Sequence, residues 1–184
     1  SQIDIASIGT PTNQTVVVAM RNSSGNLELK TVDIASNGDL NPLHDWVSGA
    51  AKRVKVREWG NGAVTAIRDE NDDLLVTHWD IDGAGNISWQ GNSGNLAGFA
   101  QDISLSKHGD LYTGIRTAGG NMKIIEWQVG AGSPTRINDS GSDGDAVFSG
   151  SDIFVTGGFG GVGGHLLSVG RRSNGNLQGR LWSH

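Results

Sequence analysis

The sequence contains no cysteine, only three prolines and one tyrosine, and no long apolar run. Without cysteine there is no disulfide framework, no zinc site built on thiolates and no cysteine nucleophile. Val16–Met20 is among the longest apolar runs. It falls far short of the roughly 18 residues that a membrane-spanning helix needs. We therefore expect no membrane span.

Positive charge is also scarce, because 14 Lys and Arg face 19 Asp and Glu, which gives a formal net charge of −5. This balance argues against nucleic acid and anionic membrane surfaces as partners. The five histidines show no metal-ligand spacing, and there is no G-x-S-x-G elbow. The sequence therefore predicts no metal and no cofactor. A Ser-His-Asp triad assembled from distant loops stays open, but no residue selects one.

Glycine, with 29 residues, is what the chain has in excess. Short β-rich runs alternate with Gly, Asn, Asp and Ser, a pattern typical of all-β proteins. A short helix fits only at about Leu43–Ala51. A length of 184 residues favours a single domain over residues 1–184.

The chain repeats itself. Three segments of similar sequence begin at Val16, Ala63 and Leu111. In each, an arginine ends the first strand, at Arg21, Arg68 and Arg116. An apolar residue opens the next strand six positions later, at Leu27, Leu74 and Met122. The same frame can be laid on a fourth segment from Ile153. There Gly158 takes the place of the arginine, and Val169 takes the place that Trp79 and Trp127 hold in the second and third segments.

Further short strands complete each unit. One precedes each segment, at Ile3–Ile5, Val54–Arg57, Ile103–Leu105 and Val147–Ser149. Another opens at Gly38-Asp39-Leu40, Gly85-Asn86-Ile87, Ser133-Pro134-Thr135 and Gly175-Asn176-Leu177. Four strands in about 46 residues are typical of a β-propeller blade. We expect an all-β propeller of four-stranded antiparallel blades, with repeats at about 1–50, 51–98, 99–144 and 145–184. A two-sheet sandwich is the alternative, but it does not account for a regular four-fold repeat.

One unit carries a family pattern. The second unit has a polar turn at Asp72-Asp73, an aliphatic strand at Leu74–Val76, a Trp79-Asp80 turn and then Trp89. This pattern resembles the blades of sugar-binding β-propeller lectins, the fucose-lectin-like and tachylectin-like groups. The third unit keeps Arg116 and Trp127. The resemblance implies carbohydrate binding.

The candidate ligand-binding residues are Trp79, Trp127, Arg68, Arg116, Asp80 and Trp89. An exposed indole stacks on the C–H face of a sugar, and a neighbouring Arg or Asp bonds its hydroxyls. The alternative for Trp79 and Trp127 is that both fill space between blades. The alternative for the arginines is a repeated ion pair or a bond to turn carbonyls.

Two further patterns have plain explanations. Asp80-Ile81-Asp82-Gly83 resembles the start of a calcium loop, but no distal glutamate closes it, so a hairpin turn is favoured. The glycine-rich stretch at residues 157–164 contains a G-x-G-x-x-G spacing without a surrounding βαβ unit. A hairpin loop accounts for that stretch better than dinucleotide binding.

These patterns predict a non-catalytic, lectin-like protein, secreted or extracellular, whose partner is a glycan. One alternative is a protein-interaction or structural propeller that binds a protein surface. It would be a fragment or a homo-oligomeric subunit of a larger ring, since four units fit a four-bladed ring or half of an eight-bladed one. A second alternative is an enzyme that acts on polysaccharide.

Overall fold

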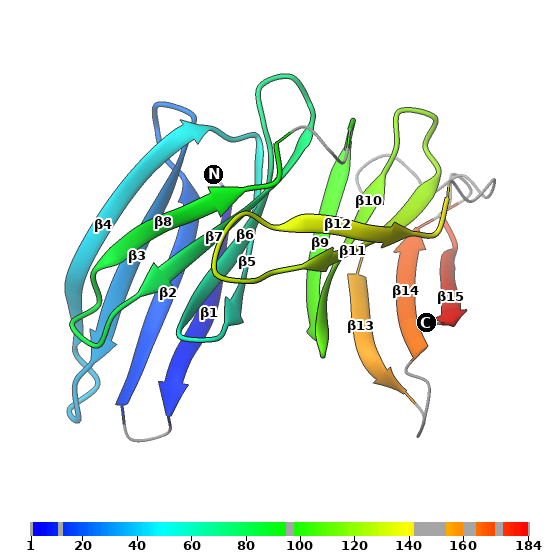
Figure 1. The fold of residues 1–184 in the computed structure, drawn as a ribbon. Coiled ribbons are helices and arrows are strands. Elements are labelled where there is room, and N and C mark those ends of the chain that lie inside the picture. The colour runs from blue at the N-terminus through cyan, green and yellow to red at the C-terminus, as the bar shows by residue number, and fades with distance from the viewer. Residues whose placement is uncertain are drawn as a thin grey trace.

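A computed structural model describes residues 2–10, 13–94, 98–141, 154–159, 165–171 and 175–183. These residues form fifteen β-strands and no helix (Figure 1), which confirms the all-β class. Accordingly, the described part of the chain has no helix that could cross a membrane.

The strands form four separate antiparallel sheets in chain order. The first sheet contains β1 (Ile3–Thr10), β2 (Asn13–Arg21), β3 (Asn26–Ile34) and β4 (Leu40–Ala50). The second contains β5 (Arg53–Trp59), β6 (Gly62–Arg68), β7 (Leu74–Ile81) and β8 (Ile87–Asn92). The third contains β9 (Asp102–His108), β10 (Asp110–Arg116), β11 (Met122–Gln128) and β12 (Thr135–Asp139). The fourth contains β13 (Phe154–Phe159), β14 (His165–Arg171) and β15 (Leu177–Ser183).

Successive sheets stand face to face, with the first sheet at one side of the molecule and the fourth at the other (Figure 1). The first strand of each sheet contacts the first strand of the next, so β1 meets β5, β5 meets β9 and β9 meets β13. We call each contact between successive sheets a seam. A sheet with a neighbour on both sides buries both faces, which explains why its strands do not alternate cleanly between apolar and polar residues.

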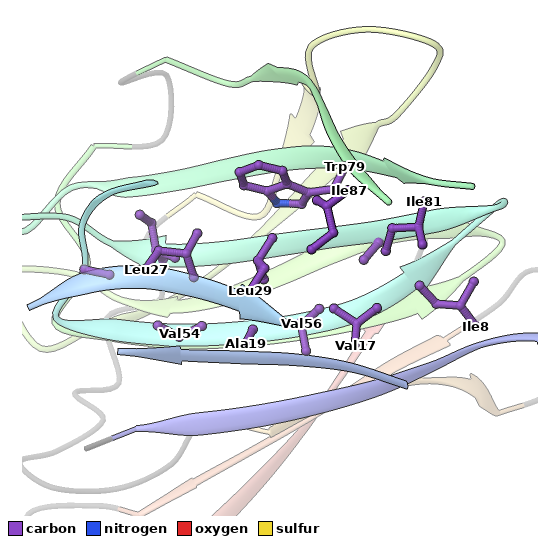
Figure 2. Packing of buried hydrophobic residues seen from close by; sticks show 13 residues of the cluster. Ile8, Val17, Ala19, Leu27, Leu29, Val54, Val56, Trp79, Ile81 and Ile87 are labelled. Carbon is purple, nitrogen blue, oxygen red and sulfur yellow. The ribbon is translucent and has the colours of Figure 1, made fainter. Parts of the chain in front are cut away.

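Each seam contains an apolar cluster. In the first seam, Leu27 and Leu29 of the first sheet pack with Val54, Val56 and Trp79 of the second (Figure 2). A second cluster joins the second and third sheets. A third cluster joins Tyr112 and Ile124 of the third sheet to Leu166 of the fourth, with Trp182 against it. Apolar burial between sheets thus builds the core.

The helix expected at Leu43–Ala51 is not formed, because most of that segment belongs to β4. In β4, His44 pairs with Thr31 and Trp46 with Leu29 of β3. Alternation with period two directs both side chains to the face that Leu29 and Thr31 share. Pairing with β3 and burial of that face decide the strand conformation, which local sequence left ambiguous.

The expected frame of the fourth repeat is wrong. β14 ends at Arg171 and β15 begins at Leu177, so these two residues correspond to Arg21 and Leu27. Trp182 follows Arg171 by eleven positions, as Trp79 follows Arg68. Gly158 and Val169 therefore do not stand at the arginine and tryptophan positions. The strand expected at Val147–Ser149 lies outside the described residues.

The four arginines of the corrected frame share one turn geometry. The residue four positions after each arginine has a positive φ, at Gly25, Asp72, Gly120 and Gly175. Asp72 is the only non-glycine residue with a positive φ in the described chain. Its carboxylate accepts hydrogen bonds from Arg68 Nε at 2.7 Å and Lys52 Nζ at 2.5 Å. These bonds hold the pKa of Asp72 below its usual value, with Lys52 the larger cause.

A second repeated contact ties the strands of a sheet together. The indole N–H of Trp79 donates to Thr65 Oγ1 at 2.9 Å, and that of Trp127 donates to Thr113 Oγ1 at 2.9 Å. In the fourth sheet the N–H of Trp182 donates to Ser168 Oγ at 2.7 Å. The first sheet has valine at both corresponding positions, Val18 and Val32. In each of the four sheets, the hydroxyl residue and the tryptophan are therefore either both present or both replaced.

The substitution Thr65→Val tests the hydrogen bond from Trp79 to Thr65, because it keeps the side-chain shape and leaves the buried indole N–H of Trp79 without its acceptor. We expect the free energy of unfolding to fall by about 1–3 kcal/mol, measured by urea denaturation. Thr135→Val, at an exposed position of β12, is the matched control and should change stability by less than about 0.5 kcal/mol. Equal effects at the two positions would contradict the assignment.

Candidate functional site

Trp79 and Trp127 do not present a ring face to solvent. Both side chains are fully buried in the first and second seams. The ring of Trp46 also packs on Trp79 in an edge-type arrangement, with ring centroids 6.1 Å apart. The ligand-binding expectation for these two indoles is therefore corrected in favour of the alternative, that they fill space between sheets.

Arg68 bonds to the turn that follows its own strand and to the residue that precedes β9 of the third sheet. Besides Asp72, its Nη1 donates to the carbonyl of Gln101 at 3.0 Å. Arg116 occupies the same position in the third sheet, and its Nε is buried without a hydrogen-bond partner in the described structure. Arg68 therefore makes an ion pair and a hydrogen bond to a carbonyl. This agrees with the structural role that was the alternative to ligand binding for the repeated arginines.

Trp89 and Asp80 lie at the surface but do not converge. Trp89 is 53% exposed and sits directly opposite Trp79 on β8. Asp80 pairs with Ser88, one position along, so it points to the other face of the sheet. Asp80 and Asp82 line a hollow of about 300 Å³ between the turns of the first two sheets.

Asp82 holds its own hairpin turn. Its carboxylate accepts from the backbone N–H groups of Ala84 and Asn86, both at 2.9 Å, and from the Asn86 side chain at 2.8 Å. These bonds, that of the Asn86 side chain above all, keep the pKa of Asp82 below its usual value. Residues 80–83 are therefore part of a hairpin turn, as the sequence pattern favoured over a calcium loop. No group of three or more potential metal ligands occurs among the described residues.

A different site emerges at the third seam. A pocket of about 140 Å³ lies between the third and fourth sheets. Its lining combines one indole, one phenol, two carboxylates, an amide, a hydroxyl and two aliphatic side chains, from Trp182, Tyr112, Glu126, Asp139, Asn138, Ser140, Ile124 and Leu166. We call it the seam pocket. Its mixture of an aromatic wall with several polar groups is typical of sites that orient a small polar ligand.

The seam pocket is open for a structural reason. Trp46 pairs with Leu29 in the first sheet, and its ring contacts Trp79 across the seam. Ser140 is bonded to Ile124 at the corresponding place in the third sheet, by hydrogen bonds of 3.0 Å in both directions. A serine fills far less space than an indole. Trp182 is accordingly half-buried, where Trp79 is fully buried.

The second seam is closed in another way. Ser93 bonds to Val76 there as Ser140 bonds to Ile124. In addition, Gly91 of β8 lies so close to Ser133 that any side chain at Gly91 would collide with the backbone of Ser133. This contact brings the loop before β12 against β8. The fourth sheet has three described strands, so no described outer strand covers the third seam in this way.

Tyr112 and Glu126 form the polar wall of the seam pocket. The Tyr112 hydroxyl donates to Glu126 Oε1 at 3.5 Å, and both side chains are buried. Burial, and then the charge of Glu126, raise the pKa of Tyr112 far above its usual value. The phenol therefore stays protonated in the folded protein and can act as a hydrogen-bond donor.

The second carboxylate of the seam pocket is already engaged. Asp139 forms ion pairs with Arg136 and with Lys123, the latter at 3.4 Å. Burial lowers the pKa of Lys123, and the charge of Arg136 lowers it further. Two cations therefore compensate the charge of Asp139.

Sequence reasoning did not select Trp182, Tyr112, Glu126, Asn138 or Ser140. A signal for Trp182 exists, because it stands eleven residues after Arg171. Arg171 follows Arg116 by 55 residues, whereas the earlier arginines are 47 and 48 apart. That longer interval concealed the correct frame.

No protein-family model and no curated protein matches this sequence. Among solved structures, the chain is similar to the crystal structure of a protein from Lactobacillus plantarum, with 14% sequence identity and a TM-score of 0.58. The match covers 97% of this chain and 56% of that one, so this chain spans little more than half of its length. The likeness concerns the fold alone and is consistent with a propeller-like arrangement of sheets.

The single tyrosine makes the seam pocket directly measurable, because Tyr112 is the only phenol in the chain. An unfolded phenol ionises near pH 10, whereas folded Tyr112 keeps its proton. Its stabilising contribution is thus complete below about pH 10 and is lost as the pH rises towards the folded pKa. We expect the tyrosinate absorbance to appear only together with unfolding, followed by circular dichroism.

Ionisation of Tyr112 near pH 10 in the folded chain would contradict its burial beside Glu126. Tyr112→Phe supplies the control, since it should remove the tyrosinate signal and reduce the loss of stability at alkaline pH.

Proposed function

We propose that the four sheets are consecutive blades of a β-propeller. The stacking of sheets in chain order supports this, as does the contact of each first strand with the next. The arginine turn recurs in all four sheets, and the bond from a tryptophan N–H to a hydroxyl recurs in three of them, which supports equivalent units. A sandwich of two sheets would not place four separate sheets in one series.

We further propose that the chain is a non-catalytic, extracellular binding module whose ligand is a single sugar unit held in the seam pocket. The observation that carries this proposal is the half-buried Trp182 beside the Tyr112–Glu126 pair in an open hollow. An indole stacks on the apolar face of a sugar ring, while polar groups bond its hydroxyls. The pocket of about 140 Å³ is smaller than the roughly 300–1,000 Å³ of drug-sized sites, so it suits a small ligand.

The groups of the seam pocket have separate roles in this proposal. The N–H of Trp182 is occupied by Ser168, so the ring contributes stacking rather than a hydrogen bond. Arg180 lies 5.5 Å from the centre of that ring and reinforces its position. Glu126 accepts hydrogen bonds. The Asn138 side chain at the exposed rim can donate through its NH₂ group, while its Oδ1 already accepts from the Asp139 backbone N–H at 2.9 Å.

The pocket chemistry favours binding over hydrolysis. Cleavage of a glycosidic bond usually requires one carboxylic acid and one carboxylate with separate roles. In the seam pocket, Asp139 is held by Arg136 and Lys123. A polysaccharide-acting enzyme is therefore the weaker candidate.

A glycan array, run with calcium and then with EDTA, tests the binding proposal. We expect a reproducible hit that does not need calcium. Asn138→Ala removes up to two hydrogen bonds at the rim and should weaken binding by about tenfold, which corresponds to about 1.4 kcal/mol. Glu126→Gln keeps the shape of the wall, removes its charge and should weaken binding as well.

Trp89→Ala is the matched control, because Trp89 is an exposed indole outside the seam pocket. This variant should bind like the unmodified chain. Loss of binding in Trp89→Ala, with unchanged binding in the two pocket variants, would move the site to the second sheet. A blank array in both conditions would overturn the carbohydrate proposal.

A second candidate function is a structural or protein-interaction propeller. The observation that favours it lies at the two ends of the series of sheets, where apolar faces are uncovered.

A further inference from the structure

Two apolar sheet faces lie open to solvent, one at each end of the series. On the first sheet, Ile3 and Ile5 of β1 are 66% and 61% exposed. On the fourth sheet, Leu177 and Leu181 of β15 are 78% and 62% exposed. Exposed apolar patches of this kind on a soluble protein mark interaction surfaces.

Each open face corresponds to a face that is buried elsewhere in the chain. Ile3 and Ile5 stand opposite Met20 and Val18, as Val54 and Val56 stand opposite Ile67 and Thr65 in the second sheet. Val54 and Val56 are buried in the first seam. Leu177 likewise corresponds to Leu27 and Leu74, which are buried in the first and second seams.

The seams follow one rule. We call the face that carries the tryptophan position the leading face, and the opposite one the trailing face. In every seam the leading face of a sheet packs on the trailing face of the sheet before it: Trp79 faces Leu29, Trp127 faces Val76, and Trp182 faces Ile124. The leading face of the first sheet and the trailing face of the fourth are therefore the two complementary halves of one missing seam.

We infer that a second copy of this chain covers both open faces, so that two chains close a ring of eight sheets. Within one chain the two faces lie at opposite ends of the series (Figure 1). A second copy placed head to tail brings the fourth sheet of each chain against the first sheet of the other. This arrangement forms two identical interfaces related by a two-fold axis and leaves no open face.

The number of sheets supports two copies. Propellers contain roughly four to eight blades. Two chains reach eight sheets, whereas three chains would make twelve. The proposed pairing also continues the packing seen in the three existing seams, with the same faces in the same order.

The charges on the leading face of the first sheet do not oppose this pairing. Glu28 and Lys30 stand where the second sheet has Leu75 and Thr77, and they form an ion pair at 2.8 Å. Their mutual hydrogen bond is the main reason why the pKa of Glu28 is lowered and that of Lys30 raised. Lys30 also stands opposite Asp45 of β4, so its charge is compensated by two carboxylates of this face. The rest of the face presents aliphatic side chains along β1 and β2, among them Ile3, Ile5 and Val18.

The solution mass of the full chain tests the inference. Analytical ultracentrifugation should give twice the mass of one chain at micromolar concentration, with or without sugar, so the result is separable from the binding proposal. Ile5→Lys and Leu181→Glu each place a charge in both copies of the interface, and each alone should give a monomer. Ile137→Lys, at an exposed isoleucine of β12 outside both open faces, should stay a dimer.

Mixing the two monomeric variants makes the test specific for head-to-tail pairing. In a mixed dimer, one interface contains both substitutions, whose charges attract, and the other interface contains neither. We expect the mixture to regain the dimer mass. A monomeric unmodified chain would overturn the inference. A dimer that persists in both variants, or one that mixing does not restore, would overturn the head-to-tail arrangement.

Discussion

The contact between the leading face of one sheet and the trailing face of the next organises this protein. A single four-stranded sheet has two faces and cannot bury either one alone. The seams solve this by stacking the sheets in chain order, with Leu29, Val76 and Ile124 each set against the tryptophan position of the following sheet. The hydrophobic effect supplies most of the stabilisation at such contacts, because the apolar area removed from water is large. The internal bonds of each sheet, such as that from Trp79 to Thr65, hold the strands in the register that the seam requires.

The same construction accounts for the proposed site. A seam filled by bulky side chains is closed, as where Trp46 contacts Trp79. A seam with a small residue at that place and no described outer strand beside it leaves a hollow, as where Ser140 and Trp182 meet the Tyr112–Glu126 pair. In the proposed function, binding specificity depends on a few residues at the rim of a seam, while the packing beneath stays the same. If two copies close a ring, each chain contributes one such pocket, and two sites on one particle bind a multivalent glycan more firmly than one site does.

Much of the fold could be predicted from the sequence. The short strands between glycine-rich turns indicated an all-β protein, and the arginines at positions 21, 68 and 116 indicated repeated units. The fourth repeat was placed wrongly, because its arginine lies 55 residues after the third and not 47 or 48. The segment at Leu43–Ala51 was ambiguous for a physical reason. Its apolar spacing fits a short helix locally, and only pairing with β3 makes the extended form favourable.

The sequence by itself determined most strands and turns of the first three sheets, with β4 as the exception, because those depend on local patterns of period two and on residues that tolerate a positive φ. It could not determine which tryptophans are covered. Trp79, Trp89 and Trp182 look alike in the sequence, yet one is fully buried, one is exposed and one is half-buried. That difference arises from neighbours far away in the chain, such as Trp46 and Ser140, whose size decides whether a seam is filled. Burial is a property of the packed sheets, so the tertiary structure alone decided where a pocket opens.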